Sequence, residues 1–97
     1  MTIVINHKIG QNIAKERIVE FLNQKAKENT NFISNYEANW TGYSGNIKAT
    51  AKNINFNGTI DIGMDSVRIE TVVPLVFSMF KSKVKHVIVE EVSKILY

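Results

Sequence analysis

The chain has 97 residues, of which 44% are hydrophobic and 22% charged; these proportions fit one soluble globular domain over residues 1–97 and exclude a disordered or collagen-like chain. The absence of cysteine excludes a disulfide framework, an iron–sulfur cluster and a thiol nucleophile. The net charge of +3 is spread along the sequence and falls short of the dense basic patch that is typical of nucleic-acid-binding proteins.

The first two elements are predicted to be a strand and an amphipathic helix. Residues 3–5, Ile-Val-Ile, form the short β-branched run that is typical of a strand. Gly10 then fits the N-cap of a helix over residues 11 to about 29. Apolar residues recur along this helix at three- and four-residue spacing, which places them on one face: Ala14, Ile18, Phe21, Leu22 and Ala26.

A meander of strands is predicted to follow the helix. From residue 36 to residue 73, apolar and polar side chains alternate, as in antiparallel strands with one dry and one solvated face. Turns are predicted at residues 42–45, 52–53 and 63–65. The dry face of the last two strands should carry these apolar residues: Ile54, Phe56, Ile60, Ile62, Val67 and Ile69.

Two positions in the meander carry specific expectations. Asn57-Gly58 is a strong hairpin signal, but the alternation continues through it, so we expect an unbroken strand with Gly58 at a bulge or a close-packing position. Trp40 shares a face with Tyr36 and Ala38. We expect its ring to be mostly buried near the sheet edge, with the indole N–H bonded or reaching water.

The last predicted element is a long helix over residues 75–96. Pro74 fits its first position, where the missing N–H has no helical partner in any case. Apolar residues recur along it at helical spacing: Phe77, Phe80, Val84, Val87, Ile88, Val92 and Ile95. The order βαββββα therefore predicts an α+β fold, with an antiparallel sheet and two helices packed on one face.

Two charged side chains fall within the apolar faces of the predicted helices, Glu91 in the second and Lys25 in the first. An isolated buried charge costs several kcal/mol, so each must be paired or must reach solvent. With four meander strands between them, the helices run antiparallel. We therefore expect Glu91 to pair with Arg17 or Lys15, and Lys25 to reach solvent beside the start of the second helix.

No catalytic constellation is visible in the sequence. His7 and His86 are isolated, and no metal-ligand spacing, nucleophile elbow or phosphate-binding glycine loop is present. We therefore expect no catalytic residue, no metal, no cofactor and no enzymatic activity. The N-terminal residues do not show the pattern of a secretory signal, so none is expected. The most apolar run, residues 72–80, is too short to span a bilayer. A cytoplasmic protein without a transmembrane segment is expected.

The remaining candidate for function is the start of the second helix, where apolar residues precede a group of lysines. We take these as candidate surface-contact residues: Val76, Met79, Phe80, Lys81, Lys83 and Lys85. An apolar helix end beside basic residues suits an anionic or apolar surface, such as a lipid-coated inclusion, or a partner protein. The alternative is that the apolar residues cap the core or form a homodimer seam.

Two other classes of function stay open. An RNA- or ribosome-associated module would use the lysines, but Lys83 points away from Lys81 and Lys85, and no strand carries a pair of exposed aromatic residues for base stacking. Nucleic acid is therefore less favoured as a partner. A small-ligand protein would hold its ligand between the sheet and the helices, which predicts an enclosed cavity.

The layout of the chain resembles the polyhydroxyalkanoic acid system proteins, small bacterial proteins associated with storage-granule gene regions. The resemblance extends from residue 3 to residue 96 and rests on these motifs: His7-x-x-Gly10-x3-Ala14-x2-Arg17, Trp40-x-Gly42, Gly58-x-Ile60-x-Ile62 and Asp65-x-Val67-Arg68-Ile69-Glu70. Between Gly42 and Gly58 this chain is a few residues longer than the family's pattern. The resemblance implies a non-enzymatic accessory or binding protein of the cytosol, near a polymer granule surface.

Overall fold

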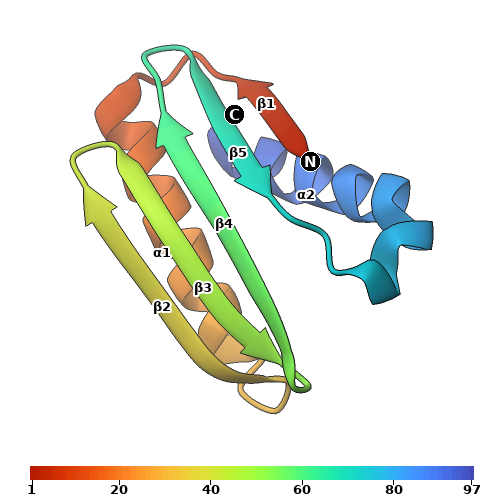
Figure 1. Ribbon diagram of the computed structural model, residues 1–97. Coiled ribbons are helices and arrows are strands. Elements are labelled where there is room, and N and C mark those ends of the chain that lie inside the picture. Colours follow the sequence, from red (N-terminus) through yellow and green to blue (C-terminus); the bar gives the residue numbers. More distant parts are fainter.

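The structure, a computed structural model, confirms the predicted α+β order (Figure 1). It describes residues 1–75 and 78–97 with their side chains, and residues 76 and 77 only as part of the backbone. The elements are β1 (Thr2–Asn6), α1 (Gln11–Glu28), β2 (Ile33–Thr41), β3 (Ser44–Ala51), β4 (Ile54–Ile62), β5 (Ser66–Thr71), the 3-10 helix η1 (Leu75–Phe80) and α2 (Lys81–Leu96).

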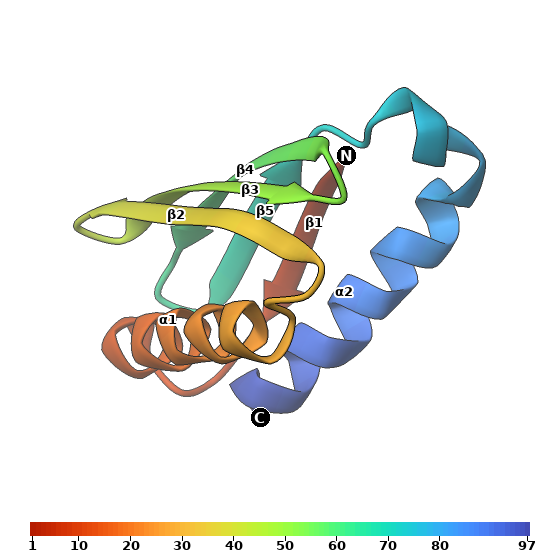
Figure 2. The same ribbon diagram turned by 90° about the horizontal axis from the view of Figure 1, so that it is seen from below.

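The five strands form one antiparallel sheet in the order β1-β5-β4-β3-β2, and both helices lie on the same face of it (Figures 1 and 2). The predicted unbroken strand through Asn57-Gly58 is confirmed. Gly58 pairs with Ile47 on one side and Thr71 on the other, in regular register and without a bulge. The hairpin signal is overridden because the alternating apolar residues of β4 need one continuous strand to share a face.

The hairpin turns are tight. Lys52 and Asn53 have φ angles of 50° and 66°, which is the predicted left-handed turn. The predicted four-residue turn at residues 42–45 is wrong, because Thr41 pairs with Ser44 and leaves only Gly42 and Tyr43 in the turn. Gly42 has a φ of 61°, and this conformation lets the strands pair up to the turn itself.

The core lies under β1, β5 and β4, where the last turns of α2 meet the middle of α1. Its buried side chains are Ile3, Ile5, Ala14, Ile18, Ile60, Ile62, Val67, Val92 and Leu96. The predicted dry face of the sheet is correct in its parity, and Ile69 packs against this core. Ile54 and Phe56, however, are only partly buried, because the helices diverge and leave the far end of β4 uncovered (Figure 2).

The prediction of one helix over residues 75–96 is wrong at its start. Phe80, with φ −105° and ψ 15°, separates η1 from α2, and no side chain caps either helix. In Figure 2, α2 reaches the body of the protein through its C-terminal turns and carries its N-terminal turns away from the sheet. Phe80 and Val87, predicted to lie on the packed face, are consequently exposed.

The predicted pairing of Glu91 with Arg17 or Lys15 is also wrong, since Glu91 takes part in none of the ion pairs among the described side chains. Arg17 instead donates through Nη1 to the Ile95 carbonyl oxygen, at 3.1 Å. This carbonyl is in the last turn of α2, where it lacks a helical partner and the helix dipole favours a cation. Lys15 donates to the Gly42 carbonyl oxygen at 2.6 Å.

Trp40 lies on the edge strand β2, as expected, and is partly buried with its ring over Gly45 of β3. A Cβ at Gly45 would be 2.9 Å from three ring carbons, closer than van der Waals contact allows. We expect Gly45→Ala to lower the free energy of unfolding by about 1–3 kcal/mol through overpacking. Asn46→Ala, at the next position on the outer face, should change it by less than about 0.5 kcal/mol. Urea unfolding followed by Trp40 fluorescence measures both, and equal stabilities would contradict this packing.

Candidate functional site

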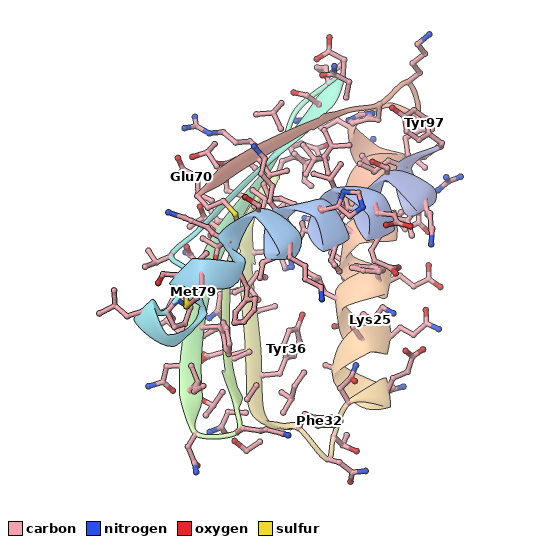
Figure 3. The ribbon with its side chains drawn as sticks, turned by 90° about the vertical axis from the view of Figure 1, so that its right-hand side faces the viewer. Lys25, Phe32, Tyr36, Glu70, Met79 and Tyr97 are labelled. Carbon is pink, nitrogen blue, oxygen red and sulfur yellow. The ribbon has the colours of Figure 1, made fainter. Side chains whose placement is uncertain are left out.

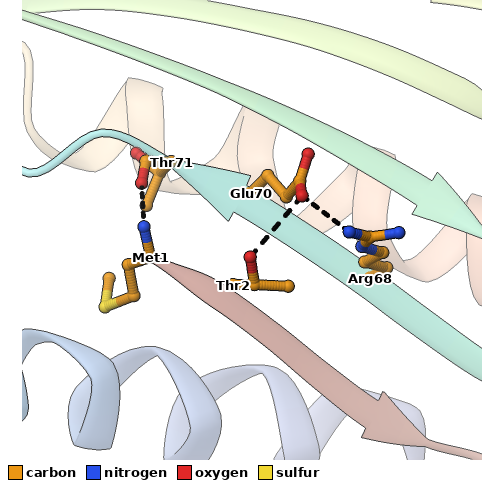
Figure 4. Close-up of polar contacts among 5 residues, drawn as sticks. All are labelled: Met1, Thr2, Arg68, Glu70 and Thr71. Atoms are coloured by element: carbon orange, nitrogen blue, oxygen red, sulfur yellow. Dashed lines mark hydrogen bonds and ion pairs between the residues drawn. The ribbon is translucent and has the colours of Figure 1, made fainter.

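The chain leaves the sheet at a firmly held point. The N-terminal ammonium group of Met1 donates to the Thr71 carbonyl oxygen at 2.9 Å, and the Thr71 N–H donates to the Met1 carbonyl at 3.0 Å (Figure 4). Beside them, Glu70 accepts from Thr2 at 3.5 Å and from Arg68 at 2.7 Å. These contacts fix the end of β5, so the segment that follows is projected from a defined place.

The segment beyond β5 exposes large apolar side chains, which we call the apolar tip: Val72, Leu75, Met79 and Phe80. Leu75 and Met79 are 91% and 90% exposed. Figures 2 and 3 show η1, with Met79, at the outer end of α2, away from the C-terminal residue Tyr97. Of the residues predicted for surface contact, Val76 lies outside the described side chains, as does Phe77 of the predicted packed stripe.

The predicted lysines follow the apolar tip directly. Lys81, Lys83 and Lys85 occupy the first turns of α2, and all three are exposed. None of them takes part in an ion pair among the described residues, and the first turn of α2 contains no acidic residue. Because the N-terminal end of a helix is itself the positive end of its dipole, positive charge is concentrated beside the tip.

A second feature lies between the helices and the sheet, and we call it the groove. It has a volume of about 500 Å³ and is open to solvent, whereas the small-ligand interpretation predicted an enclosed cavity. Ala49 of β3 and Gly58 of β4 form part of its floor, α1 contributes Phe21 and Lys25, and α2 contributes Glu91 among others. Lys25 is exposed, as predicted, but it lies along this groove with Val87 and Glu91 and not beside the start of α2.

Tyr36 stands off β2 on the side of the sheet that faces α1 (Figure 3). Its hydroxyl is buried and has no hydrogen-bond partner among the described residues, and burial raises the pKa of Tyr36 above its ordinary value of 10.0. The pKa of Tyr36 is therefore higher in the folded than in the unfolded state. The resulting contribution to stability is fully present below the unfolded-state pKa and is lost as pH rises through the folded-state pKa. We therefore expect alkaline pH to destabilise the wild type more than Tyr36→Phe. Urea unfolding at pH 8 and pH 11 measures the difference, and equal losses would contradict the burial of this hydroxyl.

The two histidines differ in burial, and His7 keeps its ring nitrogen Nδ1 buried without a hydrogen-bond partner among the described residues. His7 is buried, with Nε2 at 3.2 Å from the Gly63 carbonyl oxygen, and it ties the start of α1 to the β4–β5 turn. His86 is exposed on α2, 3.5 Å from Glu90. The described side chains contain no group of three His, Asp or Glu residues that could hold a metal ion. None of the described helices is long and apolar enough to cross a membrane.

Comparison with known protein families gives a match. A family model described as "Putative polyhydroxyalkanoic acid system protein" matches residues 1–96. The chain belongs to this family. No curated protein and no solved structure matches the chain.

The motifs by which the chain resembles the polyhydroxyalkanoic acid system proteins have structural roles here. Gly10, with φ 83°, caps α1, and Gly42 forms the β2–β3 turn. His7 is buried and Arg17 binds the end of α2. These residues maintain the fold, and the apolar tip and the groove are separate features that we take as candidate surfaces for function.

The sequence identified the tip only in part. Met79, Phe80 and Lys81, three of the predicted contact residues, are exposed at the junction of η1 and α2, which was not predicted. Leu75, the most exposed large apolar residue among the described side chains, is not one of the predicted contact residues, since the sequence predicted it only as the first residue of the long helix. The signal that could have found it is Pro74, which has an extended ψ of 146° and starts a new direction of the chain.

Proposed function

We propose that the protein is a non-enzymatic binding protein that attaches to the surface of polyhydroxyalkanoate granules through the apolar tip and the adjacent lysines. The observation that supports this most strongly is the nearly complete exposure of Leu75 and Met79 on a projecting helix. Soluble monomeric proteins seldom expose contiguous apolar patches unless these contact a partner or a surface.

The expected energetics suit reversible attachment. Burying a fully exposed Leu or Met side chain contributes about 1.5–3 kcal/mol. A lysine close to an anionic surface contributes about 1 kcal/mol more, and salt screens this contribution. The tip carries two such apolar residues, and Lys81, Lys83 and Lys85 are exposed beside it. Together these residues support adsorption to an apolar layer with anionic groups at its surface.

The family description connects these proteins with the polyhydroxyalkanoic acid system, so granules of that polyester are the surface to test. Purified protein is incubated with isolated granules at about 50 mM and about 500 mM salt and then pelleted. We expect the protein in the pellet at both salt concentrations, with a smaller bound fraction at the higher one. Protein that stays wholly in the supernatant at low salt would contradict the proposal.

An RNA-binding role has less support from the geometry. The outer face of the sheet carries mainly polar side chains, among them Asn39, Asn46 and Asn57, and lacks the pair of aromatic rings that stacks bases. The same protein tested with a single-stranded RNA at about 50 mM salt, where phosphate contacts are strongest, is expected to show no binding.

A further inference from the structure

None of the described side chains fills the groove, and the reason is local. Its floor includes Ala49 and Gly58, which are too small to fill the space between the diverging helices. The walls are mostly apolar, and they include Phe21 and Leu22 on one side and Ile88 on the other. A volume of about 500 Å³ is within the roughly 300–1,000 Å³ that is usual for small-molecule sites.

Two opposite charges line this apolar groove from its two helical walls. Lys25 of α1 and Glu91 of α2 do not form an ion pair with each other among the described residues. Lys25 has Glu28 at 3.8 Å, but both side chains are about half exposed, at 46% and 49%, so this contact is weak. The ammonium group therefore remains able to bind an anion that enters the groove.

A simple fatty carboxylate would satisfy Lys25 but would be repelled by Glu91. A ligand that also carries a hydroxyl close to its carboxylate avoids this conflict, because the hydroxyl donates a hydrogen bond to a carboxylate oxygen. We propose that the groove binds an aliphatic hydroxy acid, with its chain on the apolar floor, its carboxylate at Lys25 and its hydroxyl donating to Glu91.

This site is separate from the apolar tip and does not rest on the proposed function. None of the four tip residues lines the groove. A protein that fails to bind granules can therefore still bind the hydroxy acid, and the reverse also holds. The two proposals are tested by different variants.

The test uses the full chain with three probes of equal chain length: 3-hydroxydecanoate, decanoate and decan-1-ol, all below their micellar concentrations. Binding is followed by NMR of labelled isoleucine methyl groups. We expect shifts at the isoleucines that line the groove, Ile18, Ile47, Ile60, Ile69 and Ile88, and none at Ile13 on the exposed side of α1. The hydroxy acid should bind about tenfold more tightly than decanoate, because its hydroxyl bonds to a charged acceptor.

Filling the groove should abolish the binding of all three probes. Ala49→Phe places a ring on the floor, and Val87→Trp fills the groove from α2. The native Val87 side chain is 48% exposed, so we expect the fold to tolerate this substitution. Asn46→Phe puts the same ring on the outer face of β3 and should leave binding unchanged. Unchanged binding in both groove variants would overturn the proposal.

Charge variants test the two polar contacts. Glu91→Gln should raise the affinity for decanoate and reduce the difference in affinity between the hydroxy acid and decanoate. Lys25→Met should lower the affinity for both acids about threefold to tenfold and leave the affinity for decan-1-ol unchanged. Lys27→Met is the matched control, since it removes the same charge at a residue that does not line the groove.

Equal binding of decanoate and 3-hydroxydecanoate to the wild type would overturn the proposal. So would a fall in the sedimentation coefficient of the ligand-free protein from a dimer value to a monomer value on Ala49→Phe, because it would show that a second copy occupies the groove.

Discussion

Replacing Ile18 by alanine should lower the free energy of unfolding by about 3 kcal/mol. Ile18 is 1% exposed and lies in the core where α1, α2 and the sheet meet. Its removal leaves a cavity that the surrounding strands and helices cannot close, so the lost transfer energy and the cavity term add. Leu96→Ala, at the other helix of the same core, should cost a similar amount.

Phe56→Ala is the informative comparison. From the alternation alone, Phe56 would be a core residue and the same substitution would cost about 3–5 kcal/mol. In the structure it is partly buried at the wall of the open groove, where solvent already reaches the ring. We expect a loss of less than about 1.5 kcal/mol, measured by urea unfolding beside Ile18→Ala. Equal losses for the two variants would mean that the groove is closed in solution.

The double variant Leu75→Ser/Met79→Ser should reduce the affinity for granules about 100-fold or more while leaving stability unchanged. Each side chain contributes at least about 1.5 kcal/mol on burial, and two such losses correspond to roughly two orders of magnitude. Both residues are at least 90% exposed, so the fold does not depend on them.

The matched control for this variant is Val4→Ser/Ile13→Ser. These side chains are 59% and 47% exposed and are not part of the tip, so their loss removes exposed apolar surface elsewhere, although less of it than the tip variant removes. Cosedimentation over a series of granule concentrations gives the affinities of both variants. A similar weakening by the control would show that adsorption follows general hydrophobicity and does not depend on the tip.

The elements that the sequence predicted well are those in which short-range periodicity and packing agree. The stripe that contains Ala14 and Ile18 predicted α1, and the alternation through Asn57-Gly58 predicted β4. In both, a single buried face determines the register, because a slip by one residue would turn the whole apolar set toward solvent.

The features that the sequence could not predict depend on how whole helices lie relative to each other and to the sheet. The apolar residues of α2 extend over its full length, but only the last turns pack, because α2 crosses α1 at an angle. Because of this crossing, Arg17 contacts the Ile95 carbonyl oxygen and does not pair with Glu91. It also opens the groove. The charges of Lys25 and Glu91 on apolar helix faces were the sequence signal for that opening.

The most direct test of granule attachment uses the absence of native cysteine. Met79→Cys and, as control, Asn46→Cys on the outer sheet face each give one site for a fluorophore that is sensitive to its surroundings. On addition of granules we predict a blue shift and a rise in intensity for the label at position 79 and no change at position 46. An unchanged emission at position 79, or the same shift at both positions, would contradict attachment through the apolar tip.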